Sequence, residues 1–170
     1  MMMKRIIPLV LITLGILLGF GALSQLYLNN REGTTATVNL PNELAGLRLT
    51  DTQAGAAAIA AFTDLHGKEF PVTSGAIGIY GNREATLWVA GAPSESVALE
   101  MTNAMQQKIA KGNSPFTPLA EINDRNRKIY ALEGMGQKHY YFQSKNLVIW
   151  LAVDPAFADD ALQQILEVYS

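Results

Sequence analysis

The hydrophobic and polar positions divide the chain into one long apolar run and a longer region of short apolar segments separated by turn residues. The apolar run extends from Ile6 to Leu28 and contains few polar side chains. As a helix it would be about 35 Å long, enough to cross a hydrocarbon core of roughly 30 Å. The pattern therefore predicts a single transmembrane helix at residues 6–28.

Charges on either side of the run predict its orientation. Lys4 and Arg5 precede it, whereas Arg31 after it is balanced by Glu32. Basic residues favour the cytoplasmic side of a membrane. We expect residues 1–5 in the cytoplasm and the rest, beyond the helix, outside it. The predicted location is the cell membrane, single-pass, with a periplasmic or outer-surface domain and membrane lipid as the first partner.

A cleaved signal peptide is the alternative interpretation of this segment. Ala22 and Ser24 are small residues that suit the −3 and −1 positions of a peptidase site, and cleavage there would leave Gln25 at the mature N-terminus. The apolar run continues through Leu26 and Leu28, which favours an uncleaved anchor.

Small residues form a stripe inside the predicted span. Gly15 and Gly19 make a GxxxG pair, and Ala22 continues the same face at helical spacing. Such a stripe allows a neighbouring helix to approach closely, so other transmembrane subunits are expected partners. The alternative is that glycine is simply frequent in membrane helices.

The remainder predicts a short linker and one α+β domain. Residues 29–38 are polar and lack a helical period, and the domain is placed at 39–170. A first helix is predicted to start at Asp51 or Thr52 and to end at Gly67, with three inward residues, Ile59, Phe62 and Leu65. Two strands, 75–80 and 85–90, follow as a hairpin.

Further turn signals predict a second helix, more hairpins and a third helix. Pro93 and Ser94 open the second helix, which ends near Lys111. Strands are expected at 119–122, 128–132, 139–143 and 147–153, so the sheet should be antiparallel. Asp154 and Pro155 start the last helix. Its inward residues are predicted to be Phe157, Ala161, Ile165 and Val168.

A short internal sequence similarity suggests a duplicated β-β-α unit. Trp88 and Trp150 are 62 residues apart, and each is followed at the same spacing by an alanine and by the proline that precedes a helix. Duplication would relate the two hairpins by a pseudo-twofold axis and place both helices on one face. Convergence on the same strand-to-helix residues is the alternative.

Several apolar and aromatic residues are candidates for contact with a partner. The strands around Trp88 and Trp150 are apolar on both sides, and Tyr141 lies on a neighbouring strand. Met135, between two glycines, could offer a soft side chain from a mobile loop. The alternative is that the aromatics complete an ordinary core and the loop is a plain turn. Arg125, Arg127 and Lys128 form a basic turn, either solvated or in contact with anionic groups.

Composition removes several classes of function. The formal net charge is −2 with interleaved signs, which argues against a nucleic-acid partner. The absence of cysteine excludes iron–sulfur clusters and thiol nucleophiles. The two histidines, His66 and His139, lack the spacing of a metal site, and no GxSxG or P-loop pattern occurs. We therefore expect no catalytic residue, no cofactor and no metal, and the small-molecule ligand is left open.

These features predict a non-catalytic accessory or assembly subunit of a multi-subunit membrane complex of bacterial type. Its helix would hold it in the bilayer, and its α+β domain would lie outside the cytoplasm. The second hypothesis is a membrane-tethered ligand-binding or sensory module. That hypothesis predicts a concave pocket lined by the tryptophans, whereas the first predicts a flat contact surface.

Overall fold

The computed structural model describes residues 38–66, 71–112 and 114–170. The predicted span 6–28 with its stripe Gly15, Gly19 and Ala22, almost all of the linker 29–38, and Gly67 lie outside these residues. Among the residues that are described, none of the helices has the length and apolar character that a membrane crossing needs.

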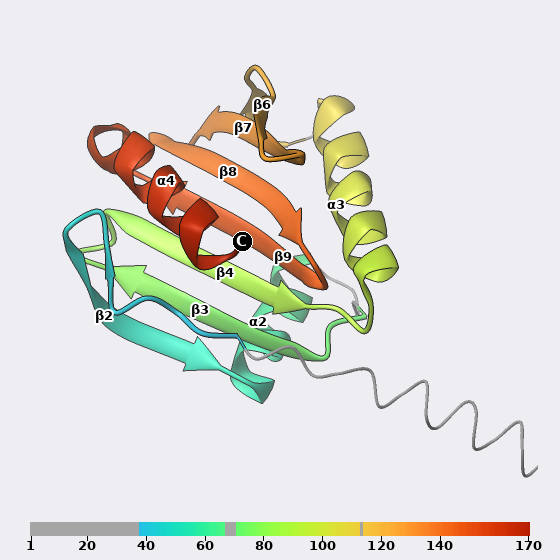
Figure 1. Ribbon diagram of the computed structural model, residues 1–170, viewed down its shortest axis with the longest axis horizontal. Helices are drawn as coiled ribbons and strands as arrows, with labels where there is room; N and C mark the ends of the chain where they lie inside the picture. Colours follow the sequence, from blue (N-terminus) through green and yellow to red (C-terminus); the bar gives the residue numbers. More distant parts are fainter. Residues whose placement is uncertain (1–37, 67–70, 113) are drawn as a thin grey trace, which may run out of the picture. The chain divides into compact units, whose positions relative to one another are not determined.

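The domain is built on one curled antiparallel sheet, and its class is α+β (Figure 1). The strand order is β1-β2-β3-β4-β9-β8-β7-β5, with β6 also paired to β7. The strands are β1 (Glu43–Leu44), β2 (Leu47–Ala54), β3 (Ser74–Tyr80), β4 (Ala85–Gly91), β5 (Thr117–Pro118), β6 (Ile122–Asp124), β7 (Arg127–Gly134), β8 (Gln137–Ser144) and β9 (Leu147–Val153).

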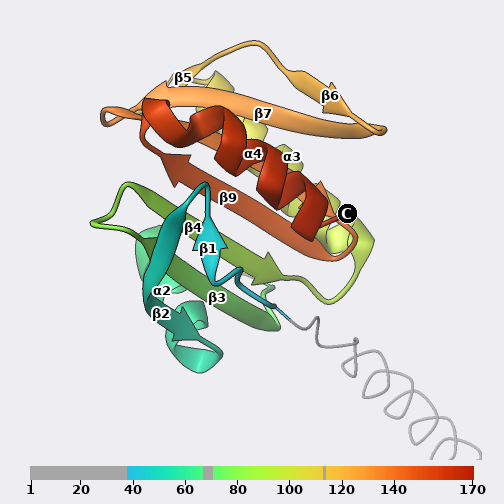
Figure 2. The same ribbon diagram turned by 60° about the vertical axis from the view of Figure 1, so that its left-hand side comes forward.

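Helices cover both faces of the sheet. Among the described residues they are α2 (Ala56–His66), α3 (Glu95–Ala110) and α4 (Ala158–Val168), the last preceded by a 3₁₀ turn at Pro155–Phe157. In Figure 1, α4 lies across the front of the sheet and α2 lies behind it. Figure 2 shows α3 on the far side of the sheet from α4.

The main core lies between α4 and the sheet. Alternate residues of β4 and β9, including Leu87, Ile149 and Leu151, are fully buried there. Ala161 and Ile165 of α4 are also fully buried against them, which confirms two of the inward residues predicted for this helix. Phe157 is partly buried, whereas Val168 is 46% exposed, so its predicted inward position is wrong.

The opposite face, which we call the α2/α3 face, carries two smaller clusters. One joins Ala98 of α3 to Val148 of β9, and the other joins Ile109 of α3 to Leu132 and Tyr141. The predicted start of this helix is confirmed, because the Ser94 hydroxyl accepts a hydrogen bond from the Val97 amide. α3 therefore covers β8 and β9.

The prediction for the first helix is partly wrong. Asp51 and Thr52 belong to β2, where Thr52 pairs with Gly78, and the helix starts only at Ala56. Polar residues on an exposed strand resemble helix caps in sequence, and this caused the error. Phe62 is buried as expected, but Leu65 is 70% exposed.

A glycine on β3 explains how α2 reaches the sheet. A β-carbon at Gly75 would lie 2.6 Å from Cε2 of Phe62, so only glycine leaves room for the ring. Gly75 therefore serves packing.

The strand predicted at 119–122 is also wrong, because this region forms two shorter strands, β5 and β6. β5 pairs at Thr117 and Pro118, and β6 begins at Ile122. Pro118 cannot donate a backbone hydrogen bond, which limits pairing here to a short edge. The other predicted strands are confirmed within a few residues.

The duplicated β-β-α unit is contradicted by its helices. β4 and β9 are central neighbours, and Trp88 pairs directly with Trp150, as a twofold relation of the two hairpins requires. However, α3 packs on the α2/α3 face while α4 packs on the other, whereas a twofold axis through the sheet would keep both on one face. The internal sequence similarity is confined to β4 and β9 and to the prolines that follow them.

Candidate functional site

The two tryptophans face the same side of the sheet, on its α2/α3 face. They occupy directly opposed positions on β4 and β9, and Tyr141 is the partner of Trp150 on β8. The Tyr141 ring stacks on that of Trp150 at 5.2 Å between centroids, and the Tyr130 ring stacks on Tyr141 at 4.7 Å. We call Tyr130, Tyr141 and Trp150 the aromatic row.

His139 and Phe116 complete the packing around Trp150. The Phe116 ring lies 4.7 Å from the His139 ring and 5.2 Å from that of Trp150. The Trp150 indole nitrogen donates to His139 Nδ1 at 3.2 Å, and His139 Nε2 lies 3.0 Å from the Gly134 carbonyl oxygen. Nε2 must therefore carry the proton of a neutral ring, because Nδ1 accepts. Burial lowers the pKa of His139, although the Gly134 hydrogen bond acts in the opposite direction.

The aromatic row belongs mainly to the core. Tyr141 is only 1% exposed, under α3, so it presents no surface to a partner. Trp150 is half-buried between Phe116 and α3. Of the predicted contact residues on this face, Trp88 is the one that borders an open part of the sheet.

Met135 lies apart from the tryptophans. It is 77% exposed in the two-residue turn between β7 and β8, where Met135 and Gly136 both have positive φ. Positive φ at both central residues is typical of a type I′ hairpin turn. The structure therefore brings Trp88, Trp150 and Tyr141 onto one face and places Met135 at the tip of a hairpin.

The open part of the α2/α3 face is a depression of about 210 Å³, which we call the Trp88 hollow. Apolar side chains and polar side chains line it together. They are Ile77, Ile79 and Trp88, with Asp51, Thr52, Gln53, Arg83 and Thr86. The hollow lies between α2, which contacts β2 and β3, and α3, which contacts β8 and β9.

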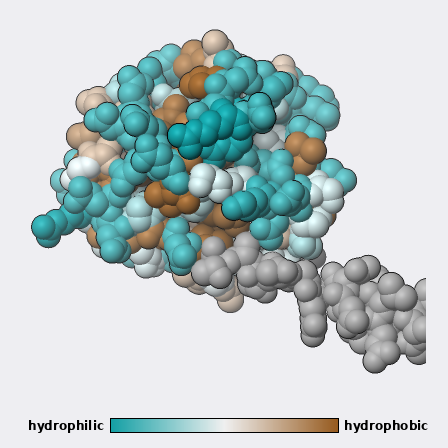
Figure 3. All heavy atoms as spheres, viewed as in Figure 1, coloured by the Kyte–Doolittle hydropathy of each residue, from teal (hydrophilic) through white to brown (hydrophobic). Residues whose placement is uncertain are grey.

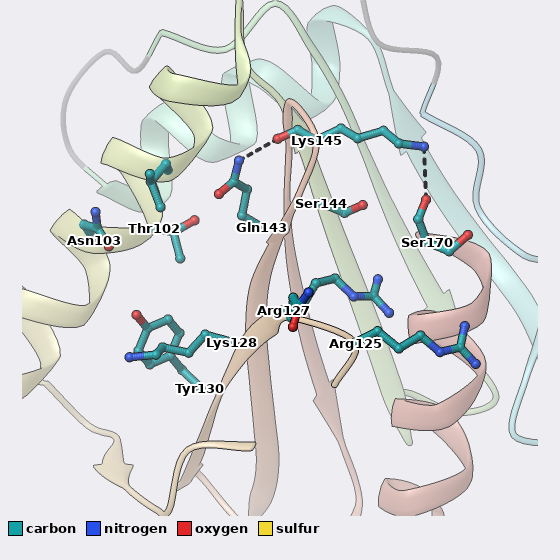
Figure 4. Close-up of a pocket in the computed structure, with 12 residues that line it drawn as sticks. Thr102, Asn103, Arg125, Arg127, Lys128, Tyr130, Gln143, Ser144, Lys145 and Ser170 are labelled. Atoms are coloured by element: carbon teal, nitrogen blue, oxygen red, sulfur yellow. Dashed lines mark hydrogen bonds between the residues drawn. The ribbon is translucent and has the colours of Figure 1, made fainter. Parts of the chain in front are cut away.

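A second and larger cavity of about 510 Å³ lies at one end of the sheet, beside α3 and Ser170 (Figure 4). We call it the basic pocket, because four cationic residues line it and none of the described lining residues is Asp or Glu. The cations are Arg125, Arg127, Lys128 and Lys145.

Two of these cations have carboxylate partners, and one of them also supports the fold. Arg127 contacts Asp124 at 2.9 Å and donates to the carbonyl oxygens of Leu166 and Tyr169, at the end of α4. Lys128 contacts Glu121 at 3.0 Å, and this raises the pKa of Lys128. Arg127 is therefore a cap for α4, whose last carbonyls need donors.

The other two cations lack an Asp or Glu partner within the described chain. Lys145 donates to the Ser170 oxygen at 3.0 Å, and Arg125 has no hydrogen bond or ion pair with a described residue. The sequence predicted a basic turn at Arg125, Arg127 and Lys128 but missed Lys145. The sequence did contain a signal for Lys145. Residues 145–146 separate two predicted strands, and a long cationic side chain is unusual at such a turn position.

No known protein family, curated protein or solved structure matches the chain. Across the described ranges, no group of three or more His, Asp or Glu residues is arranged to hold a metal ion. Function must therefore be argued from the two surfaces alone.

Proposed function

We propose that this protein is a membrane-anchored accessory or assembly subunit of a multi-subunit membrane protein complex. Its α+β domain lies outside the cytoplasm and contacts another subunit of that complex through the Trp88 hollow. The predicted helix at 6–28 holds the protein in the bilayer, and its small-residue stripe packs on a second transmembrane helix.

The shape of the surface around Trp88 is the observation that carries this proposal. Small-molecule pockets usually enclose about 300–1,000 Å³, and the Trp88 hollow of about 210 Å³ is smaller. An apolar floor of Ile77, Ile79 and Trp88 with polar neighbours is instead typical of a protein contact surface.

The face of the domain on the side of α4 supports the choice of the Trp88 hollow as the contact surface. Seen from the side of α4, the domain is mostly hydrophilic, and hydrophobic residues show only in small separate areas outside the grey atoms (Figure 3). A contact surface that excludes water needs contiguous apolar area. On the α2/α3 face, Ile77, Ile79 and Trp88 lie together between the two helices.

Mild detergent extraction of the full-length protein tests the assembly proposal. Native mass spectrometry should detect it with membrane-protein partners, and Gly15→Leu combined with Gly19→Leu should reduce the partner-bound fraction at least tenfold. Leucine at both positions would hold a neighbouring helix away.

Gly21→Leu is the matched control, since residue 21 lies about 200° around a helix from Gly19. It should leave the partner-bound fraction unchanged. A monodisperse monomer without partners, before any substitution, would contradict the proposal.

The basic pocket favours a second candidate function, a membrane-tethered ligand-binding or sensory module. Its volume of about 510 Å³ is within the range of small-molecule sites. The tryptophans do not line it, contrary to the pocket that this hypothesis predicts. A ligand there would be recognised mainly by charge, because cations dominate its lining.

A further inference from the structure

The charge of the basic pocket is incompletely balanced by the protein itself. Asp124 and Glu121 pair with Arg127 and Lys128, but neither Arg125 nor Lys145 has an Asp or Glu partner among the described residues. An arginine guanidinium offers five N–H donors in a fork that matches phosphate oxygens, and a lysine ammonium offers three. Arg125 can therefore contact an added anion without breaking an ion pair, and Lys145 can do so by sharing or exchanging its contact with the Ser170 oxygen.

Both cations come from turn positions that favour other residues. Arg125 has φ 46° and Lys145 has φ 52°, in the left-handed region that glycine and asparagine adopt more readily. Each is the first residue of a two-residue hairpin turn, since Asp124 pairs with Arg127 and Ser144 with Leu147. The fold thus places long cations where Asn or Gly would be less strained. A role for the side chain would account for this.

The remaining walls add uncharged polar groups. Asn103 of α3 and Asn126 of the turn between β6 and β7 line the pocket, and so does Tyr130. Figure 4 shows Arg125 and Lys145 extending from different turns of the chain, with the Lys145 amine directed to Ser170. The lining therefore offers an anion cations from two turns of the chain, together with amide groups.

The chain arrives from its N-terminal segment close to this pocket. The Tyr169 hydroxyl donates to the Asn39 carbonyl oxygen at 2.7 Å, and the next residue, Ser170, lines the cavity. Residues 29–38 can span at most about 35 Å when fully extended. If residues 6–28 cross the bilayer, as the proposed function holds, the linker keeps the pocket within reach of phospholipid headgroups.

We propose that the basic pocket binds a phosphate group through Arg125 and Lys145, and that the phosphate of an anionic lipid headgroup is its source. Binding there would fix the orientation of the domain on the membrane surface. The choice of lipid as the source rests on the proposed anchor. The phosphate site itself rests only on the geometry of the pocket.

Titration of the full-length protein in neutral detergent micelles tests the site. Isothermal calorimetry would follow three additions in separate arms: inorganic phosphate, phosphatidylglycerol and, as the uncharged-lipid control, phosphatidylcholine. We expect saturable binding of phosphatidylglycerol but not of phosphatidylcholine. The double variant Arg125→Asn with Lys145→Asn should weaken this binding at least tenfold, while its thermal midpoint stays equal to or above that of the parent protein.

Met135→Asn is the matched control, because Met135 has φ 55° in a comparable turn at the opposite end of β7. It should relieve the same backbone strain and leave binding unchanged. Binding of inorganic phosphate without binding of the lipid would support the phosphate site. The same result would contradict the proposal that a lipid headgroup supplies the phosphate.

Absence of binding in all arms, or equal binding by the double variant, would overturn the site. Tighter binding of a polyglutamate peptide than of phosphate or lipid would also overturn it, in favour of a protein partner. None of these arms requires a partner subunit, so they are independent of the assembly test.

Discussion

The packing of the α2/α3 face around His139 depends on the protonation state of the His139 ring. It is 4% exposed, its Nδ1 accepts the Trp150 indole proton, and its Nε2 is directed to the Gly134 carbonyl. A second ring proton would place two donors, Trp150 Nε1–H and His139 Nδ1–H, against each other. The folded protein therefore favours the neutral ring, in agreement with the lowered pKa of His139.

This arrangement predicts a loss of stability on acidification. In the unfolded chain the pKa of histidine is about 6.5, so below that pH the unfolded state binds the proton while folded His139 resists it. Stability should fall as the pH drops from about 6.5 towards the lower folded pKa, by at most about 1.4 kcal/mol per pH unit. Urea denaturation of the full-length protein at pH 7.5 and 5.5 measures the difference.

His139→Gln is the control, because its amide can accept from Trp150 and donate to Gly134 without titrating. The variant should lose less stability than the parent between the two pH values. Equal losses would mean that the pKa of His139 does not differ between the folded and unfolded states.

At the scale of elements, α2 depends on one close contact with β3. Gly75→Ala would place a methyl group where Cε2 of Phe62 is 2.6 Å away, and the ring must move. We expect a decrease in the free energy of unfolding of about 1–3 kcal/mol, the range typical of overpacking. Adding Phe62→Leu should give less than the sum of the two single effects, since the smaller side chain relieves the clash.

Thermal or urea denaturation of the two single variants and the double variant measures this coupling. Purely additive effects would show that Phe62 is not what excludes a side chain at Gly75.

Local patterns predicted elements where one periodicity dominated. The strands β3, β4, β8 and β9 combine apolar segments with clear turns, and Ser94 caps α3 as expected. β2 was missed because its residues are largely exposed and polar, so pairing with β3 rather than hydrophobic alternation defines it. Which face a helix covers depends on the connection before it, and this left α3 and α4 indistinguishable in sequence.

The candidate surfaces were less accessible to such reasoning. Trp88 and Trp150 were identified from sequence, but only the sheet register shows that they are neighbours and that α3 and Phe116 cover Trp150. The basic pocket joins the turn at Arg125 to the turn at Lys145 and to Ser170, and nothing local in the sequence indicates that these three converge.

For the whole molecule, the unequal placement of helices determines which surface stays open. α4 lies on one face of the sheet, whereas α2 and α3 share the other and sit over different strands. The central pair β3–β4 is consequently left uncovered at Ile77, Ile79 and Trp88. Apolar side chains on a strand pair that no helix covers are more easily explained by contact with a partner protein than by exposure to water.

The last prediction concerns this open side. Thr86 is half-buried in β4 and lines the Trp88 hollow, so Thr86→Glu would add a charge that a partner must desolvate on contact. We expect at least a tenfold smaller partner-bound fraction in native mass spectrometry of the extracted protein, with the thermal midpoint nearly unchanged. Thr117→Glu, on the exposed edge strand β5, adds the same charge far from the hollow and should retain the partner. Retention of the partner by Thr86→Glu would place the contact elsewhere, because a carboxylate at the interface would have to be desolvated on contact.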